Sequence, residues 1–254
     1  MIKIASADDV PSIFDLFRRT YHSHSIFEQG GETRYLNQLL KGEYIGFVFV
    51  ENNTILGHAG VAMGKEFALI NYLVTDKRLR GKGIGKELFM SRESFCDASD
   101  RNFIIGYSMM QHPYSQLLYS NNFKPIGMVV GYLDIYGNSD EDFNKGNSNA
   151  EMVLCKKIKP EITISLEVPQ ICPDNRLYNS IIRTMSIKPN FTSTYQIPEG
   201  NIFSGLVPDL ESGLFTFGLI KKDQPLNFDL MLTTNQDRED FKNEIRQCYQ
   251  STIL

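Results

Sequence analysis

The stretch Leu73-Val-Thr-Asp-Lys-Arg-Leu-Arg-Gly-Lys-Gly-Ile-Gly-Lys86 decides the fold. It begins in an apolar run and ends in an amphipathic pattern, so its glycines form a turn between a strand and a helix. The first N–H groups of a helix have no partner within the helix, and glycines let a phosphate approach the backbone closely. The spacing Arg80-x-x-Gly83-x-Gly85 therefore predicts a cradle for a pyrophosphate.

Two better-known phosphate motifs do not fit this turn. A P-loop needs glycine at Arg80 and serine or threonine at Glu87. A dinucleotide fingerprint beginning at Gly81 or Gly83 needs glycine at Lys86 or Leu88, respectively, and neither is glycine. Both alternatives are therefore disfavoured.

The charge pattern points to a small anion. The chain has a formal net charge of -4 and an isoelectric point near 5.6, which argues against nucleic-acid binding through a generally basic surface. Five basic residues nevertheless crowd into the window around the turn: Lys77, Arg78, Arg80, Lys82 and Lys86. A small polyanionic ligand explains them, although a solvated basic turn is the alternative.

Composition sets wider bounds. The 254 residues, 42% hydrophobic and 22% charged, suit one large or two modest globular domains. Neither an N-terminal signal pattern nor an apolar run of membrane-spanning length is present, so we expect a cytoplasmic protein without membrane contact. The four cysteines are widely spaced and form no C-x-x-C pair, so we expect no metal site.

The rest of the first half predicts an α/β domain. A short strand at 2–5 precedes a helix begun by Ser6 and Asp9, and a second helix runs from about Glu32 to Gly42. Three strands at 44–50, 55–63 and 66–75 form an antiparallel meander before the turn. After the helix at the turn we expect a strand at 103–108, a short helix at 114–120, and strands at 124–136 and 151–158.

The glycine turn, the later segment Ser115-Gln-Leu-Leu-Tyr119 with Phe123, and the order of strands together resemble the GCN5-related N-acetyltransferase (GNAT) family. The resemblance covers about residues 1–158. It implies the GNAT fold, a central mixed and mostly antiparallel sheet flanked by helices, and acetyl-CoA or another acyl-CoA as cosubstrate. It also implies an enzyme that transfers the acyl group to an amine, with acyl-CoA and a small amine as its partners.

The resemblance also assigns the cofactor-binding residues. Backbone amides of the turn, from Arg80 to Gly85, would bind the pyrophosphate. Backbone of Leu73, Val74 and Thr75, at a bulge of the strand, would pair with pantetheine and supply an N–H to the thioester carbonyl. The assigned residues are Leu73, Val74, Thr75, Arg80, Gly81, Lys82, Gly83, Ile84, Gly85, Lys86 and Ser115. Ser115 either bonds the cofactor or caps its helix.

Two positions depart from the family's pattern. Family members often have Glu at the position of Asn71, where it assists deprotonation of the amine. Asn122 stands where glycine is usual, but asparagine tolerates the left-handed conformation that glycine serves. The substitution at Asn71 puts the direct-base route in doubt.

Acyl transfer needs a proton acceptor for the amine and a proton donor for the departing thiolate. Tyr119 occupies the family's general-acid position, and a phenol with a pKa near ~10 matches a thiolate of similar basicity. Its alternative is a core tyrosine. The candidate bases are His58, then Glu66 and His112, with water as the other carrier.

Residues 160–254 predict a smaller α+β domain beginning after Lys159. We expect strands at 162–168, 202–207 and 214–220 and helices at 174–186 and 237–250. This part has no second glycine turn, and it is either a degenerate GNAT-like half or an unrelated module. It would form one wall of the acceptor site or mediate formation of a homodimer.

Three functions stay open at this stage. The first is acylation of a small amine or amino acid by direct attack within a ternary complex. A protein or peptide acceptor is the second. The third is a catalytically silent acyl-CoA-binding module, which the asparagine at position 71 leaves open.

Overall fold

The computed structural model describes residues 1–20, 23–24, 30–109, 113–119, 122–130, 136–137, 150–159, 164–169, 187–192, 202–209 and 214–218. The chain forms two compact units, which we describe separately. The first contains residues 1–104 and 134–146, and the second contains 105–133 and 147–254. The predicted helices at 174–186 and 237–250 lie outside the described residues, as does the candidate base His112.

The first unit is built on four strands in the order β1–β3–β4–β5, each antiparallel to its neighbour. They are β1 (Ile2–Ile4), β3 (Tyr44–Glu51), β4 (Thr54–Met63) and β5 (Phe67–Thr75). Asn52 and Asn53 join β3 to β4 with φ angles of 50° and 58°, the left-handed pair that a tight hairpin requires. The predicted meander is therefore confirmed. A two-residue pairing, β2 (Ser23–His24) with β8 (Tyr136–Gly137), completes the described strands of this unit.

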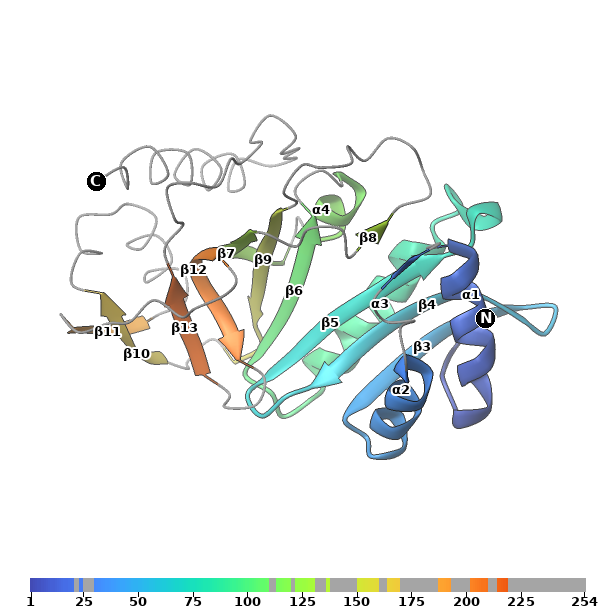
Figure 1. The fold of residues 1–254 in the computed structure, drawn as a ribbon, viewed down its shortest axis with the longest axis horizontal. Coiled ribbons are helices and arrows are strands. Elements are labelled where there is room, and N and C mark those ends of the chain that lie inside the picture. Colours follow the sequence, from blue (N-terminus) through green and yellow to red (C-terminus); the bar gives the residue numbers. More distant parts are fainter. Residues whose placement is uncertain are drawn as a thin grey trace. The chain divides into compact units, whose positions relative to one another are not determined.

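Helices cover both faces of this sheet (Figure 1). A short 3-10 turn, η1 (Ala7–Asp9), leads into α1 (Val10–Thr20), which packs on β4 and β5. Next along the chain is α2 (Gly31–Leu40), which packs on β3 and α1. On the other face lies α3 (Ile84–Asp97), where Leu88 abuts Gly57.

The core of this unit lies between α1, α2 and the sheet. Its α1 residues follow the predicted helical spacing: Val10, Ile13, Phe14 and Phe17 are buried. The predicted capping box of Ser6 and Asp9 is present, because the Ser6 N–H and hydroxyl both donate to Asp9 Oδ2, and it begins η1, which leads into α1. In α2, Tyr35 is buried, Leu36 and Leu39 are partly buried against the core, and Leu40 is 65% exposed.

The second unit contains β6 (Phe103–Met109, from Ile105 on), α4 (Pro113–Tyr119), β7 (Lys124–Val130) and β9 (Ala150–Lys157). Its sheet continues through β12 (Ile202–Asp209) and β13 (Leu214–Gly218) in the order β6–β9–β7–β12–β13. A separate parallel pair joins β10 (Ile164–Pro169) to β11 (Ile187–Thr192), a strand that the sequence analysis did not predict.

The pairing of β12 with β7 bears on the domain boundary. Gly205 lies opposite Gly127, so a strand beyond residue 159 extends a sheet that begins before it. The boundary after Lys159 stays a prediction.

Candidate functional site

The predicted passage from strand to helix is present at the end of β5. Asp76 begins a 3-10 turn, η3 (Lys77–Leu79), and Arg80 leads from it into the glycines. Gly81 and Gly83 have φ angles of 77° and 82°, the left-handed region that favours glycine. Gly83 is the N-cap of α3, which begins at Ile84.

This turn is open to a ligand. Residues 80 to 83 are exposed, and a Cβ built on Gly81 or Gly83 meets no atom within 4 Å. Gly83 has no side chain that could cap the first N–H groups of α3, and Lys82 and Lys86 are exposed beside them. A helix N-terminus of this kind attracts anions through its N–H groups and its dipole. The geometry fits a phosphate-bearing group.

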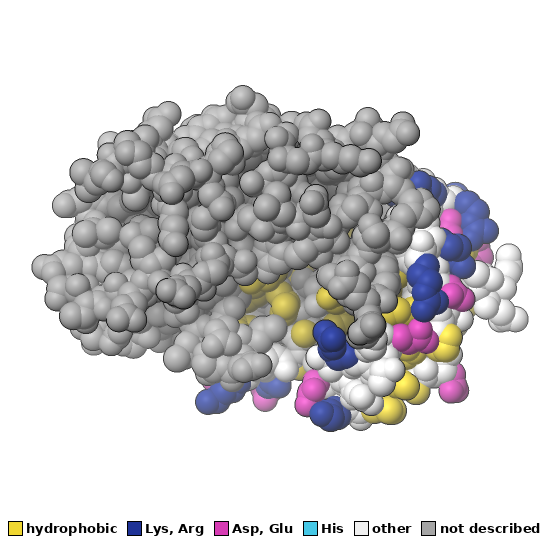
Figure 2. Space-filling model, viewed as in Figure 1, with side chains coloured by type: hydrophobic (Ala, Val, Ile, Leu, Met, Phe, Trp, Pro, Cys, Tyr) yellow, Lys and Arg dark blue, Asp and Glu magenta, His cyan; other side chains and the backbone are white. Residues whose placement is uncertain are grey.

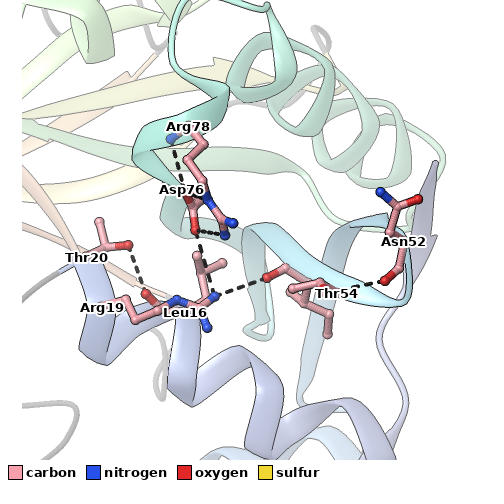
Figure 3. Close-up of polar contacts among 8 residues, drawn as sticks. Leu16, Arg19, Thr20, Asn52, Thr54, Asp76 and Arg78 are labelled. Atoms are coloured by element: carbon pink, nitrogen blue, oxygen red, sulfur yellow. Dashed lines mark hydrogen bonds and ion pairs between the residues drawn. The ribbon is translucent and has the colours of Figure 1, made fainter.

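An ion-pair cluster anchors the start of the turn (Figure 3). Asp76 accepts hydrogen bonds from the Arg78 backbone N–H at 3.0 Å and from the Arg78 guanidinium at 2.8 Å. Arg19 of α1 lies 3.9 Å from the same carboxylate and donates to the Ile55 carbonyl. The Arg78 hydrogen bonds lower the pKa of Asp76 to about 2, so the carboxylate stays charged near neutral pH.

Before the turn, at residues 72 and 73, β5 carries the bulge that the resemblance implied. His58 pairs with Val74 and Gly60 pairs with Asn71, so Ala59 alone lies opposite two residues of β5. One of these two, Tyr72, has a φ angle of 46°, which is uncommon for a residue with a large side chain. The bulge therefore interrupts the ladder at Tyr72 and Leu73, and Leu73 is the first of the assigned acyl-CoA-binding residues.

Side chains hold the carbonyls of this bulge. His58 Nδ1 lies 2.9 Å from the Tyr72 carbonyl oxygen, and Arg92 Nη1 of α3 donates to the Asn71 carbonyl at 2.7 Å. Tyr44 of β3 donates from its hydroxyl to Asn71 Oδ1 at 2.8 Å. The bulge is thus tied to β3, β4 and α3.

His58, the first candidate base, is fully buried. Its Nε2 lies 2.9 Å from the Tyr35 hydroxyl, and the edge of Phe17 packs against the ring at 5.0 Å between centroids. Burial lowers the pKa of His58 to about 4, so the ring is neutral near pH 7. Both ring nitrogens therefore have protein partners, and the role of base stays a prediction.

The second candidate base, Glu66, immediately precedes β5 and also has hydrogen-bond partners. Its carboxylate accepts a short hydrogen bond from the Asn102 side chain, and its carbonyl accepts from the N–H groups of Asn102 and Phe103. These contacts fix the chain between α3 and β6.

The candidate general acid belongs to the second unit. Tyr119 is the last residue of α4 and is 4% exposed. Its ring meets the edge of Phe123 at 4.9 Å between centroids, and a Cβ on Gly106 would lie 2.5 Å from its hydroxyl oxygen. Gly106 on β6 thus leaves the space that the phenol occupies. Ser115 on the same helix is half-buried.

Sequence reasoning missed the buried residues around the bulge, namely Tyr35, Tyr44 and Arg92. Two strand glycines were the available signal, because a glycine within a strand often marks a close approach. A Cβ on Gly46 would lie 2.5 Å from the Tyr35 hydroxyl, and one on Gly60 would overlap the Tyr44 hydroxyl. The sequence alone does not reveal which side chains use that space.

No group of three or more potential metal ligands occurs among the described residues. None of the helices in the described part of the chain is long and apolar enough to cross a membrane.

Comparisons with known proteins find a family model that matches part of the chain and solved structures with a similar fold. Residues 10–123 match the model of the acetyltransferase (GNAT) family. The ribosomal-protein-alanine N-acetyltransferase from Brucella melitensis has a similar fold, with a TM-score of 0.50 and 14% identity over 62% of this chain and 99% of that one. An N-acetyltransferase from Staphylococcus aureus Mu50 matches with a TM-score of 0.49 and 17% identity, over 63% of this chain and 98% of that one. No curated protein matches the sequence significantly.

Residues 10–123 therefore match a GNAT acetyltransferase domain, and the chain continues on the C-terminal side of it. The predicted fold class, an α/β sheet flanked by helices, is confirmed.

Proposed function

We propose that the protein is an N-acyltransferase that moves an acetyl or short acyl group from acyl-CoA to the amine of a small molecule or amino acid. The observation that carries the proposal is the exposed turn of Gly81 and Gly83, which opens the N-terminus of α3 immediately after a bulged strand. The family match supports acyl-CoA as the cosubstrate. Acyl-CoA supplies an activated acyl group and a thiol leaving group.

The turn and β5 would divide the binding of this cosubstrate. Backbone N–H groups from Arg80 to Gly85 would hold the pyrophosphate, with Lys82 and Lys86 contributing long-range attraction. The extended backbone of Leu73 to Thr75 would pair with the pantetheine arm. The N–H group of Leu73, at the bulge, would then face the thioester carbonyl oxygen.

The chemical step needs proton transfers at two atoms. Tyr119 would donate its hydroxyl proton to the departing sulfur, and Ser115 would either bond the cosubstrate or cap α4. The amine would lose its proton to water or to a side chain, for which His58 was the first candidate. Since both nitrogens of His58 already have partners, water is the better-supported carrier. Direct attack within a ternary complex needs no acylated enzyme.

A second candidate function rests on Asn71. The family resemblance implies that glutamate often stands at this position, whereas Asn71 accepts a hydrogen bond from buried Tyr44 and cannot take a proton from an amine. A catalytically silent acyl-CoA-binding module would have this property too.

Release of free thiol from acetyl-CoA separates the two. The wild-type protein is mixed with acetyl-CoA and a panel of amino acids, polyamines and aminoglycosides, and thiol is measured with a colorimetric reagent. The enzyme hypothesis expects amine-dependent release with at least one acceptor. Binding of acetyl-CoA by calorimetry without release for any amine supports the silent module, and the absence of binding contradicts both.

We also propose that residues 1–159 form the acyl-CoA-binding domain, that residues 160–254 shape the acceptor site or a homodimer contact, and that the protein works in the cytoplasm. A chain that ends at Lys159 tests the boundary. It should bind acetyl-CoA as tightly as the full chain and lose amine turnover. Failure of the shortened chain to fold would contradict the boundary, because β12 would then be needed alongside β7.

A further inference from the structure

The bulge of β5 contains a peptide group whose carbonyl end, at Tyr72, is held by a buried side chain and whose other end is the N–H of Leu73. The carbonyl of Tyr72 and the N–H of Leu73 belong to the same planar trans peptide, so their directions are opposed and fixed relative to each other. Whatever holds the Tyr72 carbonyl therefore also sets the direction of the Leu73 N–H. His58 Nδ1 lies 2.9 Å from that carbonyl oxygen.

The proton on His58 can be assigned from its partners. A carbonyl oxygen only accepts, so the 2.9 Å contact requires the proton on Nδ1. The neutral ring then has its lone pair on Nε2, which accepts from the Tyr35 hydroxyl at 2.9 Å. In this arrangement the Nε2 lone pair is already used, and Nδ1–H donates to the Tyr72 carbonyl oxygen.

The ring itself is held rigidly. Phe17 packs edge-on against it, and Tyr35 reaches it only because Gly46 has no side chain. From the opposite side of the sheet, Arg92 donates to the carbonyl of Asn71, the preceding residue of the bulge. Two successive carbonyls, those of Asn71 and Tyr72, are thus fixed by buried donors on α3 and β4.

We propose that His58 is a positioning residue, whose Nδ1–H holds the Tyr72 carbonyl so that the Leu73 N–H points at the oxygen of the thioester carbonyl. The inference rests on the proposed function, because it needs an acyl-CoA thioester beside β5. It replaces the role of base for His58 with control of the group that stabilises the developing negative charge.

The test compares three variants. His58→Leu removes the donor, and His58→Asn keeps an amide N–H near the position of Nδ1 but provides no base. Val61→Ala is the control, since Val61 is a fully buried residue of the same strand that makes no bond to the bulge in the described contacts. Val61→Ala therefore controls for the loss of stability that a substitution in the core causes.

The readouts separate positioning from stability. CoA lacks the acyl carbonyl, so the ratio of the affinities for acetyl-CoA and CoA reports on the contact with that carbonyl. We expect His58→Leu to lower this ratio by roughly 5-fold, the equivalent of one hydrogen bond of about 1 kcal/mol. Its kcat should fall by about 10²-fold, as for loss of an oxyanion donor. His58→Asn should recover most of both, and Val61→Ala should change neither.

A readout without ligand keeps the inference testable if the function proposed above is wrong. In protein labelled with ¹⁵N-leucine, the Leu73 amide resonance should move in His58→Leu and stay close to its wild-type position in Val61→Ala. Wild-type protein that neither binds acetyl-CoA nor releases thiol would contradict the proposed function, whereas an unmoved Leu73 resonance would contradict the positioning role.

Two further results would overturn the inference. One is a folded His58→Leu protein with the wild-type affinity ratio and kcat. The other is His58→Asn losing as much kcat as His58→Leu while keeping the wild-type ratio, which would identify the ring as a base. If His58→Leu does not fold, Tyr35→Phe removes one hydroxyl and should lower the ratio in the same direction by a smaller factor. An unchanged ratio and Leu73 resonance in that variant contradict the role.

Discussion

The bulge at Tyr72 and the glycine turn at residues 80–83, at the two ends of one segment, differ in what holds their backbone groups. The turn at residues 80–83 is exposed, and its glycines leave the backbone open because they have no side chains. The bulge at Tyr72 is half-buried, and buried side chains from β3, β4 and α3 hold the carbonyls of Asn71 and Tyr72 and the Asn71 side-chain amide. In the turn, backbone N–H groups are exposed because the glycines have no side chains. At the bulge, side-chain hydrogen bonds fix the orientation of the peptide groups.

This contrast predicts different responses to mutation. A change in the turn should act on ligand binding and leave the fold intact, since little packs there. A change around the bulge should act on the direction of one amide, and it should affect the chemical step more than binding. Figure 2 shows that basic and acidic side chains are intermingled on the described part of the face that it draws.

The largest effect is expected from Gly83→Val. A side chain at this position strains a φ angle of 82° and blocks close approach of phosphate to the N–H groups of α3. Acetyl-CoA affinity should fall by at least about 100-fold, which corresponds to the loss of roughly two charge-assisted hydrogen bonds. Titration calorimetry measures it.

Gly42→Val is the matched control for that change. Gly42 has a φ angle of 71° and also has open space around its Cβ position, but it ends α2. Both variants should lose similar stability in thermal melts, and only Gly83→Val should lose the ligand. Equal acetyl-CoA affinities in the two folded variants would remove the turn from the binding site.

Tyr119→Phe should give the next largest effect. If the hydroxyl protonates the departing thiolate, the variant loses a donor used in the transition state and hardly needed before it. Both kcat and kcat/KM should then fall by at least about tenfold, with acetyl-CoA affinity nearly unchanged. Steady-state kinetics and a melting curve on one preparation decide it. Wild-type kcat with a lowered melting temperature would make Tyr119 a core residue.

Asp76 lies between the two regions, and its substitution should have an intermediate effect. Asp76→Asn weakens the cap of η3 and the hold on Arg78, which should cost about 1 kcal/mol of stability. Because the folded-state pKa is lowered to about 2, the carboxylate's contribution is complete above its unfolded pKa near ~3.9 and is lost as the pH falls toward 2.

Melting temperatures between pH 6 and pH 2 measure this contribution. The wild-type protein should lose more stability over the acid range than Asp76→Asn does. Parallel curves for the two proteins would show that the Asp76 carboxylate contributes nothing to the entry of the turn.

The smallest effect is expected from Lys82→Ala. Lys82 is exposed, and an exposed charge attracts phosphate weakly and through screened solvent. Acetyl-CoA affinity should fall by about threefold at low salt and hardly at all near 1 M salt. A loss as large as that of Gly83→Val would mean that side chains, and not backbone, hold the pyrophosphate.

The sequence predicted the turn far better than the bulge. The turn depends on glycines at fixed spacing and on the strand and helix beside them, and all of these are local features. The meander was equally accessible, because Asn52-Asn53 and the apolar runs are contiguous.

The network at the bulge was not accessible in the same way. His58 was recognised as a candidate, but its partners Tyr35 and Tyr72 come from other elements and carry no motif. Its partners decide its chemistry, and only folding brings them together. The pairing of β12 with β7 was missed for a related reason, since it joins segments more than 70 residues apart.

The central claim is that the acyl group of acyl-CoA bound at the turn is transferred directly to an amine, without an acylated enzyme. Mixing enzyme with one equivalent of acetyl-CoA, with and without an accepted amine, tests it most directly by following free thiol and the intact protein mass. We expect no thiol and an unmodified mass without the amine, and thiol equal to the acylated amine with it. Thiol release accompanied by an acetylated protein, or no amine-dependent release with any acceptor, would contradict the account.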